Sequence, residues 1–171
     1  DGKSHNKDGS TTWITSKESR QDVQLIRAEH DAILTGGNTV RNDKPRMNAR
    51  VNFALNQPKK ILLTSQKEWN KDMDFFQTSD VELIAEKDLP TVITNLAQQD
   101  INAVLVEAGP KLVNAFLDEN LCDELVIYKS PDNLGDKGVS WFKDEKGFDN
   151  FNFNLKSSYT IDRDKKSIFS K

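Results

Sequence analysis

The sequence predicts an α/β fold with a mostly parallel sheet flanked by helices and an antiparallel hairpin at one edge. Short apolar runs predict strands, and segments with helical spacing separate several of them, which is typical of a parallel sheet. The predicted strands of this part lie at residues 32–35, 61–64, 81–85, 103–106 and 124–128. At the C-terminus, residues 151–161 and 167–169 flank a turn at 162–165, and this pattern predicts the hairpin.

The N-terminal third contains one predicted helix between two irregular segments. Residues 1–12 are polar and rich in turn formers, so we expect a loop there. Ser16 can cap a helix that runs to about Glu29, with Val23, Ile26 and Leu25 as its inward residues. Residues 38–58 have no regular period, and a loop of this length inside a compact domain is usually functional.

The second half is predicted to hold two helices and one long loop. Leu89, Val92, Ile93 and Leu96 follow helical spacing and predict a helix over this segment. A second apolar face predicts a helix after residue 109, formed by Leu112, Val113, Phe116 and Leu117. Residues 131–150 contain three glycines and predict a long loop.

The chain is organised around the junction at residues 107–110, which joins a strand predicted to be buried on both faces to the second of these helices. Glu107 places a carboxylate at the strand's carboxyl end, where ligands bind in open α/β sheets. Gly109 allows close approach to the backbone, and Pro110 suits the first helical position. The N–H groups of the helix start then form an anion site. The alternative is an ordinary strand-to-helix turn with a solvent-exposed glutamate.

Two further strands end in small or polar residues, at Thr35-Gly36-Gly37 and at Ser65. Parallel strands bring such ends to one edge of the sheet, and arginines at 41, 46 and 50 follow the first of them. This combination suits a phosphorylated ligand. Neither a complete G-x-G-x-x-G nor a G-x-x-x-x-G-K-[ST] pattern is present.

Composition argues against several classes of protein. The 171 residues carry a net charge of −3, which gives no basic footprint for nucleic acid. No apolar run approaches the roughly 20 residues of a membrane span, and no signal peptide is visible, so we expect a cytoplasmic protein that binds no membrane. One cysteine and two histidines make a metal site improbable.

Three segments resemble the reductase domain of the bacterial riboflavin-biosynthesis protein RibD. They are WITSKESRQDVQLIRAEHDAILTGGNTVRNDKPRMNAR at 13–50, LVEAGPKLVNAFL from Leu105 and DELVIYKSPDNLG from Asp123. Together with their order and spacing, the W-I-T start, the G-x-x-T-V-x-x-D-x-P loop and V-E-A-G make the resemblance specific. It implies a dihydrofolate-reductase-like fold, NADPH as cofactor, a homodimer, and reduction of the ribosyl group of a phosphorylated aminouracil to ribityl.

The resemblance also implies roles for particular residues. Arg50 matches a substrate position and can pair with a phosphate through two hydrogen bonds, and Glu107 can accept hydrogen bonds from ribose hydroxyls or the ring amine. Asp43 and Glu107 are the candidate catalytic residues. The positions that match cofactor contacts are Trp13, Thr39, Asp43, Ser65, Gly109, Pro110, Lys111, Leu112, Val113, Asn114 and Ala115. Those that match substrate contacts are Thr11, Arg27, Met47, Arg50 and Glu107.

Each of these residues also has a plainer interpretation. Trp13 could be a core aromatic, Arg27 a solvated helix residue, Asp43 a turn former and Arg50 a surface residue. Two departures from the family are mild, because Thr11 replaces a serine and Met47 a leucine. A larger one is the family's first strand, which carries a lysine of the active site and which we expect ahead of Asp1.

The sequence is compatible with two other functions. One is the related reductase that acts before deamination, on a diaminopyrimidinone. Another is a nucleotide-binding or assembly module that has lost catalysis, which the missing first strand favours. The H-x-E and P-C-x-x-C patterns of zinc-dependent deaminases are absent from the chain, which we treat as one reductase domain over residues 1–171.

Overall fold

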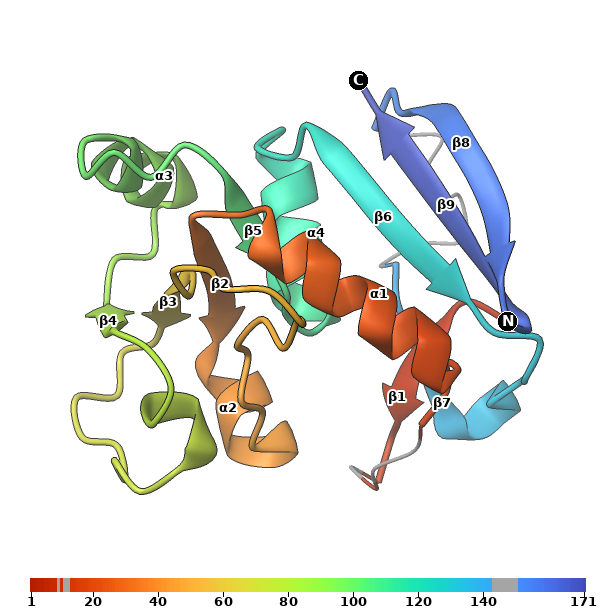
Figure 1. The fold of residues 1–171 in the computed structure, drawn as a ribbon, viewed down its shortest axis with the longest axis horizontal. Coiled ribbons are helices and arrows are strands. Elements are labelled where there is room, and N and C mark those ends of the chain that lie inside the picture. The colour runs from red at the N-terminus through yellow and green to blue at the C-terminus, as the bar shows by residue number, and fades with distance from the viewer. Residues whose placement is uncertain (9, 11–12, 143–150) are drawn as a thin grey trace. The chain divides into compact units, whose positions relative to one another are not determined.

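The computed structural model describes residues 1–8, 10, 13–142 and 151–171 (Figure 1). The chain forms two compact units. The first combines the N-terminal segment Asp1–Asp22 with the C-terminal segment Asn114–Lys171, and the second is the continuous stretch Val23–Val113.

The second unit is built on a four-stranded parallel sheet, which confirms the predicted architecture. Its strands are β2 (Ala32–Gly36), β3 (Lys59–Leu63), β4 (Val81–Ile84) and β5 (Val104–Val106), in the order β4-β3-β2-β5. The central strand β2 is buried from Ala32 to Thr35, as its apolar sequence predicts. The prediction that β5 is buried on both faces was wrong. Its residues are half-buried, because in the described sheet this short strand pairs on one side only, with β2.

Three of the helices follow from the sequence, and a fourth was missed. The predicted ones are α1 (Lys17–Ala28), α3 (Leu89–Ala97) and α4 (Pro110–Asp118). The cap of α1 is as expected, since Ser16 Oγ accepts a hydrogen bond from Ser19 N at 3.1 Å. The missed helix is α2 (Gly37–Asp43), whose seven residues carry one buried apolar side chain and no side-chain cap. So short a helix leaves no periodic pattern in the sequence. The segment predicted to be irregular, residues 38–58, is irregular only from residue 44 onward.

The buried side of α1 is more polar than predicted. Val23 and Ile26 are half-buried, but Leu25 is 46% exposed. Gln24 and Arg27 are buried instead. Buried polar groups need hydrogen-bond partners, and those of Gln24 and Arg27 are found at the candidate site described below.

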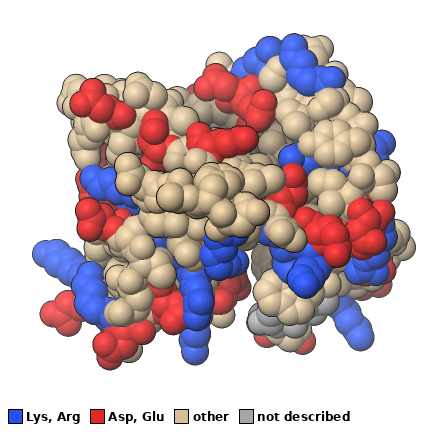
Figure 2. Space-filling model, viewed as in Figure 1, with Lys and Arg blue, Asp and Glu red and all other residues tan. Residues whose placement is uncertain are grey.

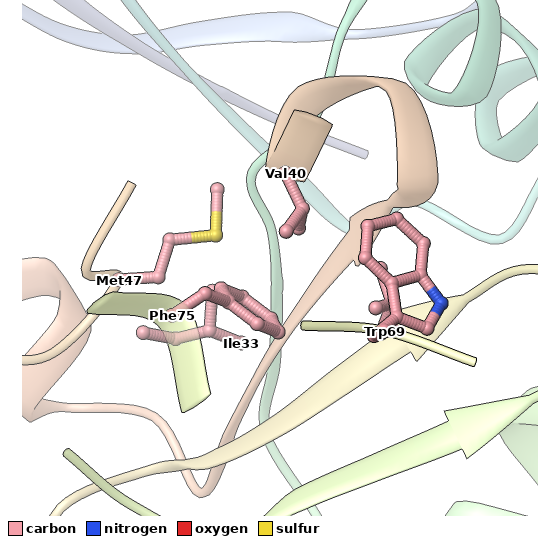
Figure 3. Packing of buried hydrophobic residues seen from close by; sticks show 6 residues of the cluster. Ile33, Val40, Met47, Trp69 and Phe75 are labelled. Carbon is pink, nitrogen blue, oxygen red and sulfur yellow. The ribbon is translucent and has the colours of Figure 1, made fainter. Parts of the chain in front are cut away.

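One buried cluster of the second unit is drawn in Figure 3. Ile33 and Leu62 come from the strands, and Val40 comes from α2. Trp69 and Phe75, the latter in the short helix η1 (Asp74–Phe76), pack against them with Met47. Met47 has a positive φ of 47°, so the chain turns sharply where this side chain enters the core.

The first unit contains two strands that were not predicted. β1 (Lys3–Asn6) pairs antiparallel with β7 (Gly138–Ser140), so the predicted loops at 1–12 and 131–150 were wrong in these parts. The polar sequence KSHN has no alternating pattern that would mark a strand. Gly138 makes the pairing possible, because a Cβ there would lie 2.6 Å from Lys3 Cβ. The short helix η2 (Gly135–Lys137) precedes β7, and residues 143–150 lie outside the described part.

The predicted hairpin is present, but it lies in a separate three-stranded antiparallel sheet, and the strand predicted at 124–128 belongs to this sheet and not to the parallel one. The hairpin is formed by β8 (Asn154–Ile161) and β9 (Asp164–Ser170), and β9 also pairs with β6 (Glu124–Lys129). Asp164, just after the turn, is fully buried and accepts hydrogen bonds from Ser16 N and Ser19 Oγ, each at 2.7 Å. Burial opposes ionisation of Asp164, but these hydrogen bonds outweigh it and lower the pKa of the carboxyl. The hairpin thereby holds the start of α1.

A buried lysine lies among the apolar residues of the parallel sheet. Lys60 of β3 has no exposed surface, and its Nζ donates to Phe75 O and Thr78 Oγ1, both at 2.6 Å. The ammonium group also lies 5.0 Å from the centre of the Phe75 ring. Burial, with a smaller contribution from the charge of Arg27, lowers the pKa of Lys60 from 10.5 to about 8.

This lysine predicts a pH dependence of stability. The unfolded chain keeps the Lys60 proton up to a pKa of 10.5, whereas the folded chain releases it at about 8. Between these values the unfolded state binds more protons, so the Lys60 contribution to the free energy of unfolding rises with pH, by about 3 kcal/mol at most. Urea unfolding at pH 7 to 10 should therefore show wild type gaining stability relative to Lys60→Met. Parallel pH profiles of the two proteins would contradict the buried charge.

Candidate functional site

The ends of three strands lie along one edge of the parallel sheet, as the sequence predicts. Gly36 is paired with Leu63 of β3, and Leu34 with Val106 of β5. Glu107 continues this pairing, because its N–H donates to Leu34 O at 3.0 Å. The residues that follow these strands, from Gly37, Thr64 and Glu107 onward, therefore start from neighbouring positions.

An ion pair occupies this edge. Arg27 Nε donates to Glu107 Oε2 at 2.8 Å, and Nη2 donates to Glu107 Oε1, so the contact is bidentate. The Arg27 side chain is 9% exposed and that of Glu107 is 32% exposed. The Glu107 carboxylate is therefore fixed by Arg27 and remains partly exposed. It differs from the alternative of a turn glutamate that is simply exposed to solvent. Arg27 Nη1 also donates to Asn48 O at 3.2 Å.

Arg50 is an exposed cation at the same edge. Its Nη1 donates to Asn48 Oδ1 at 3.1 Å, which fixes the guanidinium beside the loop. Partial burial and the charges of Arg27 and Arg46 lower the pKa of Arg50, while Glu107 opposes this shift. Arg27 and Arg46 are paired with Glu107 and Asp74, so the charge of Arg50, which stays protonated at neutral pH, is the one that suits an anionic ligand here.

The start of α4 offers backbone donors with open space beside them. Pro110 is the first helical residue, as predicted. Leu112 N and Val113 N donate to Gly109 O at 3.1 and 3.2 Å, so they serve the helix itself. Within the described residues, the N–H groups of Gly109 and Lys111 donate no backbone hydrogen bond. A Cβ added at Gly109 would meet nothing within 4 Å, so a ligand can approach this backbone closely.

The other candidate cofactor residues of the second unit surround the ends of β2 and β3. Thr39 is half-buried in α2, Asp43 is the exposed last residue of that helix, and Ser65 is exposed just after β3. Met47, by contrast, is 3% exposed in the core. Its side chain thus packs against the protein, which leaves the backbone of Met47 for the substrate contact that the resemblance implies.

The remaining predicted residues belong to the first unit. Trp13 is 70% exposed, with the Arg20 guanidinium 4.4 Å from its ring centre, so it is not a core aromatic. Asn114 is buried, and its Nδ2 donates to Trp141 O at 2.9 Å. Ala115 is half-buried. Thr11 lies outside the described residues.

Sequence reasoning missed two polar residues that support this edge. Gln24 Oε1 accepts a hydrogen bond from Arg50 N at 3.2 Å. Gln57 makes two hydrogen bonds with the backbone of Ala49. Glutamines in a helix or an aperiodic loop carry no sequence signal of such contacts, so only the fold reveals them.

The surface charge is mixed, since acidic and basic side chains alternate over the face shown in Figure 2. In the described part of the chain, no three His, Cys, Asp or Glu residues are grouped so as to hold a metal ion. A search of the same residues finds no helix with both the length and the apolar character needed to cross a membrane.

Comparison with known proteins defines the class. The chain matches the model of the RibD C-terminal domain family over residues 1–166, and it belongs to this family. Escherichia coli riboflavin biosynthesis protein RibD is 33% identical to it, over 79% of this chain and 46% of that protein. The 5-amino-6-(5-phosphoribosylamino)uracil reductase of Buchnera aphidicola (subsp. Acyrthosiphon pisum) is 30% identical, over 75% of this chain and 79% of that protein.

Solved structures agree with this membership. Acinetobacter baumannii RibD superposes with a TM-score of 0.86 and 27% identity, covering 99% of this chain and 54% of that one. The Saccharomyces riboflavin biosynthesis reductase Rib7, at 20% identity and a TM-score of 0.69, shares the fold. The chain spans about half the length of the RibD proteins that it matches.

Proposed function

We propose that this chain reduces 5-amino-6-(5-phosphoribosylamino)uracil to its ribityl compound with NADPH, as a step of riboflavin biosynthesis. The observation that carries the proposal is the Arg27–Glu107 pair beside the exposed Arg50, at the strand edge where ligands of open α/β sheets bind. The exposed guanidinium of Arg50 can bind the phosphate of such a substrate, and the partly exposed carboxylate of Glu107 can accept hydrogen bonds from its hydroxyl groups. The name of the Buchnera relative supports this choice of substrate.

The residues present fit a nicotinamide dinucleotide at the same edge. Bound NADPH supplies the hydride. The open space at Gly109 and the N–H groups of the α4 start suit its pyrophosphate, and exposed Ser65 offers a hydroxyl. Within the second unit, we assign Thr39, Asp43, Ser65 and residues 109–113 to the cofactor, and Arg27, Arg50, Glu107 and the backbone of Met47 to the substrate. Asp43 and Glu107 are the acidic groups proposed to act in catalysis.

We also propose that the protein is a cytoplasmic homodimer that binds neither nucleic acid nor membrane. Both outer strands of the antiparallel sheet, β6 and β8, have a free side for pairing within the described sheet. On β8, Leu155 is 56% exposed and Tyr159 is 46% exposed. Exposed apolar residues on an edge strand favour contact with a second copy.

The proposal is tested by following NADPH oxidation with the ribosylaminouracil phosphate and, in parallel, with the diaminopyrimidinone that precedes deamination. We expect turnover with the former and a lower kcat/KM with the latter. A reversed preference would identify the related reductase. NADPH binding in a calorimetric titration without any oxidation would instead identify a nucleotide-binding module.

A further inference from the structure

Three side chains hold the backbone of the loop that carries Arg50. Gln57 contacts Ala49 twice, with Oε1 accepting from Ala49 N and Nε2 donating to Ala49 O, both at 2.9 Å. Gln24 Oε1 accepts from Arg50 N at 3.2 Å. Together with the bond from Arg27 to the preceding carbonyl, at Asn48, these contacts hold three consecutive residues.

Gln57 acts on Ala49 as a neighbouring strand would. Its side-chain amide presents one donor and one acceptor, and both are matched to the backbone of a single residue. Residues 44–58 belong to no helix or strand, so without these contacts the loop would sample many conformations. Fixing the backbone of one residue costs roughly 1–2 kcal/mol of conformational entropy. Because these contacts order the loop before a ligand binds, binding does not lose this conformational entropy.

The loop segment between Met47 and Pro58 is flanked by a buried residue at each end. Met47 is buried in the core on one side, and Pro58, buried just before β3, follows Gln57 on the other. Between these points, Arg50 projects an exposed side chain whose guanidinium is bonded to Asn48 Oδ1. The loop backbone is thus held by two glutamine amides and the Arg27 guanidinium, while the side chain of Arg50 is exposed.

We propose that Gln57 is a positioning residue, which holds Arg50 in the conformation that receives the phosphate of the substrate, with Gln24 as its second support. The inference rests on the proposed function. Gln57 touches neither substrate nor cofactor in this scheme, and it acts through the backbone of Ala49.

The first test compares Gln57→Ala with wild type on the phosphorylated substrate and on its dephosphorylated form. We expect KM for the phosphorylated substrate to rise about ten-fold, with little change in kcat, in the NADPH dissociation constant or in KM for the dephosphorylated form. A matched control is Gln77→Ala, because Gln77 Nε2 donates to Lys71 O at 2.7 Å and so bonds the backbone of another loop in the same unit. The control should leave both KM values unchanged.

A second variant separates positioning from simple loss of stability. Gln57→Glu keeps the size of the side chain, but the ionised carboxylate has no donor for Ala49 O. A protonated carboxyl restores one donor and one acceptor. We therefore expect the KM of Gln57→Glu, divided by that of wild type at the same pH, to fall as the pH is lowered from about 8 towards the ordinary range of glutamate, near 4.3. Gln57→Ala should show no such rescue.

The possible failures are distinguishable. An active wild type whose Gln57→Ala variant behaves like Gln77→Ala overturns the positioning role alone. Equal losses of Gln57→Ala on the phosphorylated and dephosphorylated substrates overturn it too, since they indicate a general disturbance. A wild type that neither binds nor reduces the phosphorylated substrate overturns the proposed function and this inference with it.

Discussion

Glu107→Gln is expected to lower kcat/KM for the ribosylaminouracil phosphate ten-fold or more. In the structure this carboxylate is fixed by two hydrogen bonds from Arg27 while part of its surface stays open. A hydrogen bond to a charged group is worth roughly 1.5–3 kcal/mol, which corresponds to at least this loss. Steady-state kinetics check the prediction, and an unchanged kcat/KM would remove Glu107 from the site.

The same substitution is expected to lower the stability of the protein. Arg27 donates two hydrogen bonds to Glu107, and replacing the carboxylate by a neutral amide would leave the largely buried charge of Arg27 without this ionic partner. Removing one partner of a buried pair costs about 3–5 kcal/mol, and the retained amide oxygen should reduce this to about 2 kcal/mol.

A control for this effect is the exposed pair of Arg46 and Asp74. Its side chains are 59% and 53% exposed, and its N–O distance is 2.9 Å. Asp74→Asn should change the free energy of unfolding by less than about 1 kcal/mol, because solvent screens an exposed pair. Urea unfolding of both variants gives the comparison. Equal small losses would mean that the Arg27–Glu107 pair behaves as a surface contact.

The parallel sheet could be predicted because its strands are apolar runs, and that property is local. Residues 32–35 are buried in the structure for the same reason that they stand out in the sequence. The pairing of β1 with β7 could not be predicted in this way. Residues 3–6 are polar, and their partner lies more than a hundred positions later in the chain. Helix α2 has too few residues for a period to be visible.

Within the candidate site, the sequence indicated which residues are present but not how they contact one another. Arg27 and Glu107 were each predicted to hold substrate, and the structure shows that they bind each other across 80 positions of the chain. Met47 was predicted to contact substrate, and the structure places its side chain in the core. Gln57 had no distinguishing pattern, since its role depends on the course of the backbone at Ala49.

The charge pattern of the loop leads to the remaining prediction, Arg50→Lys. The Arg50 guanidinium is exposed, and Asn48 Oδ1 orients it at 3.1 Å. A guanidinium can contact a phosphate through two parallel hydrogen bonds, whereas an ammonium offers a point charge without that geometry. We therefore expect KM for the phosphorylated substrate to rise about ten-fold or more, while the NADPH dissociation constant stays within about two-fold of wild type.

A dephosphorylated substrate isolates the contact between Arg50 and the phosphate. Wild type should already use this substrate poorly, and Arg50→Lys should lower its kcat/KM little further, because the group that the arginine binds is gone. The two substrates and two proteins form a cycle in which a general disturbance of the loop cancels. Equal losses on both substrates would show that Arg50 acts on the loop rather than on the phosphate. Weakened NADPH binding with an unchanged substrate KM would show instead that Arg50 faces the cofactor, so that the two ligands occupy the sheet edge in the opposite arrangement.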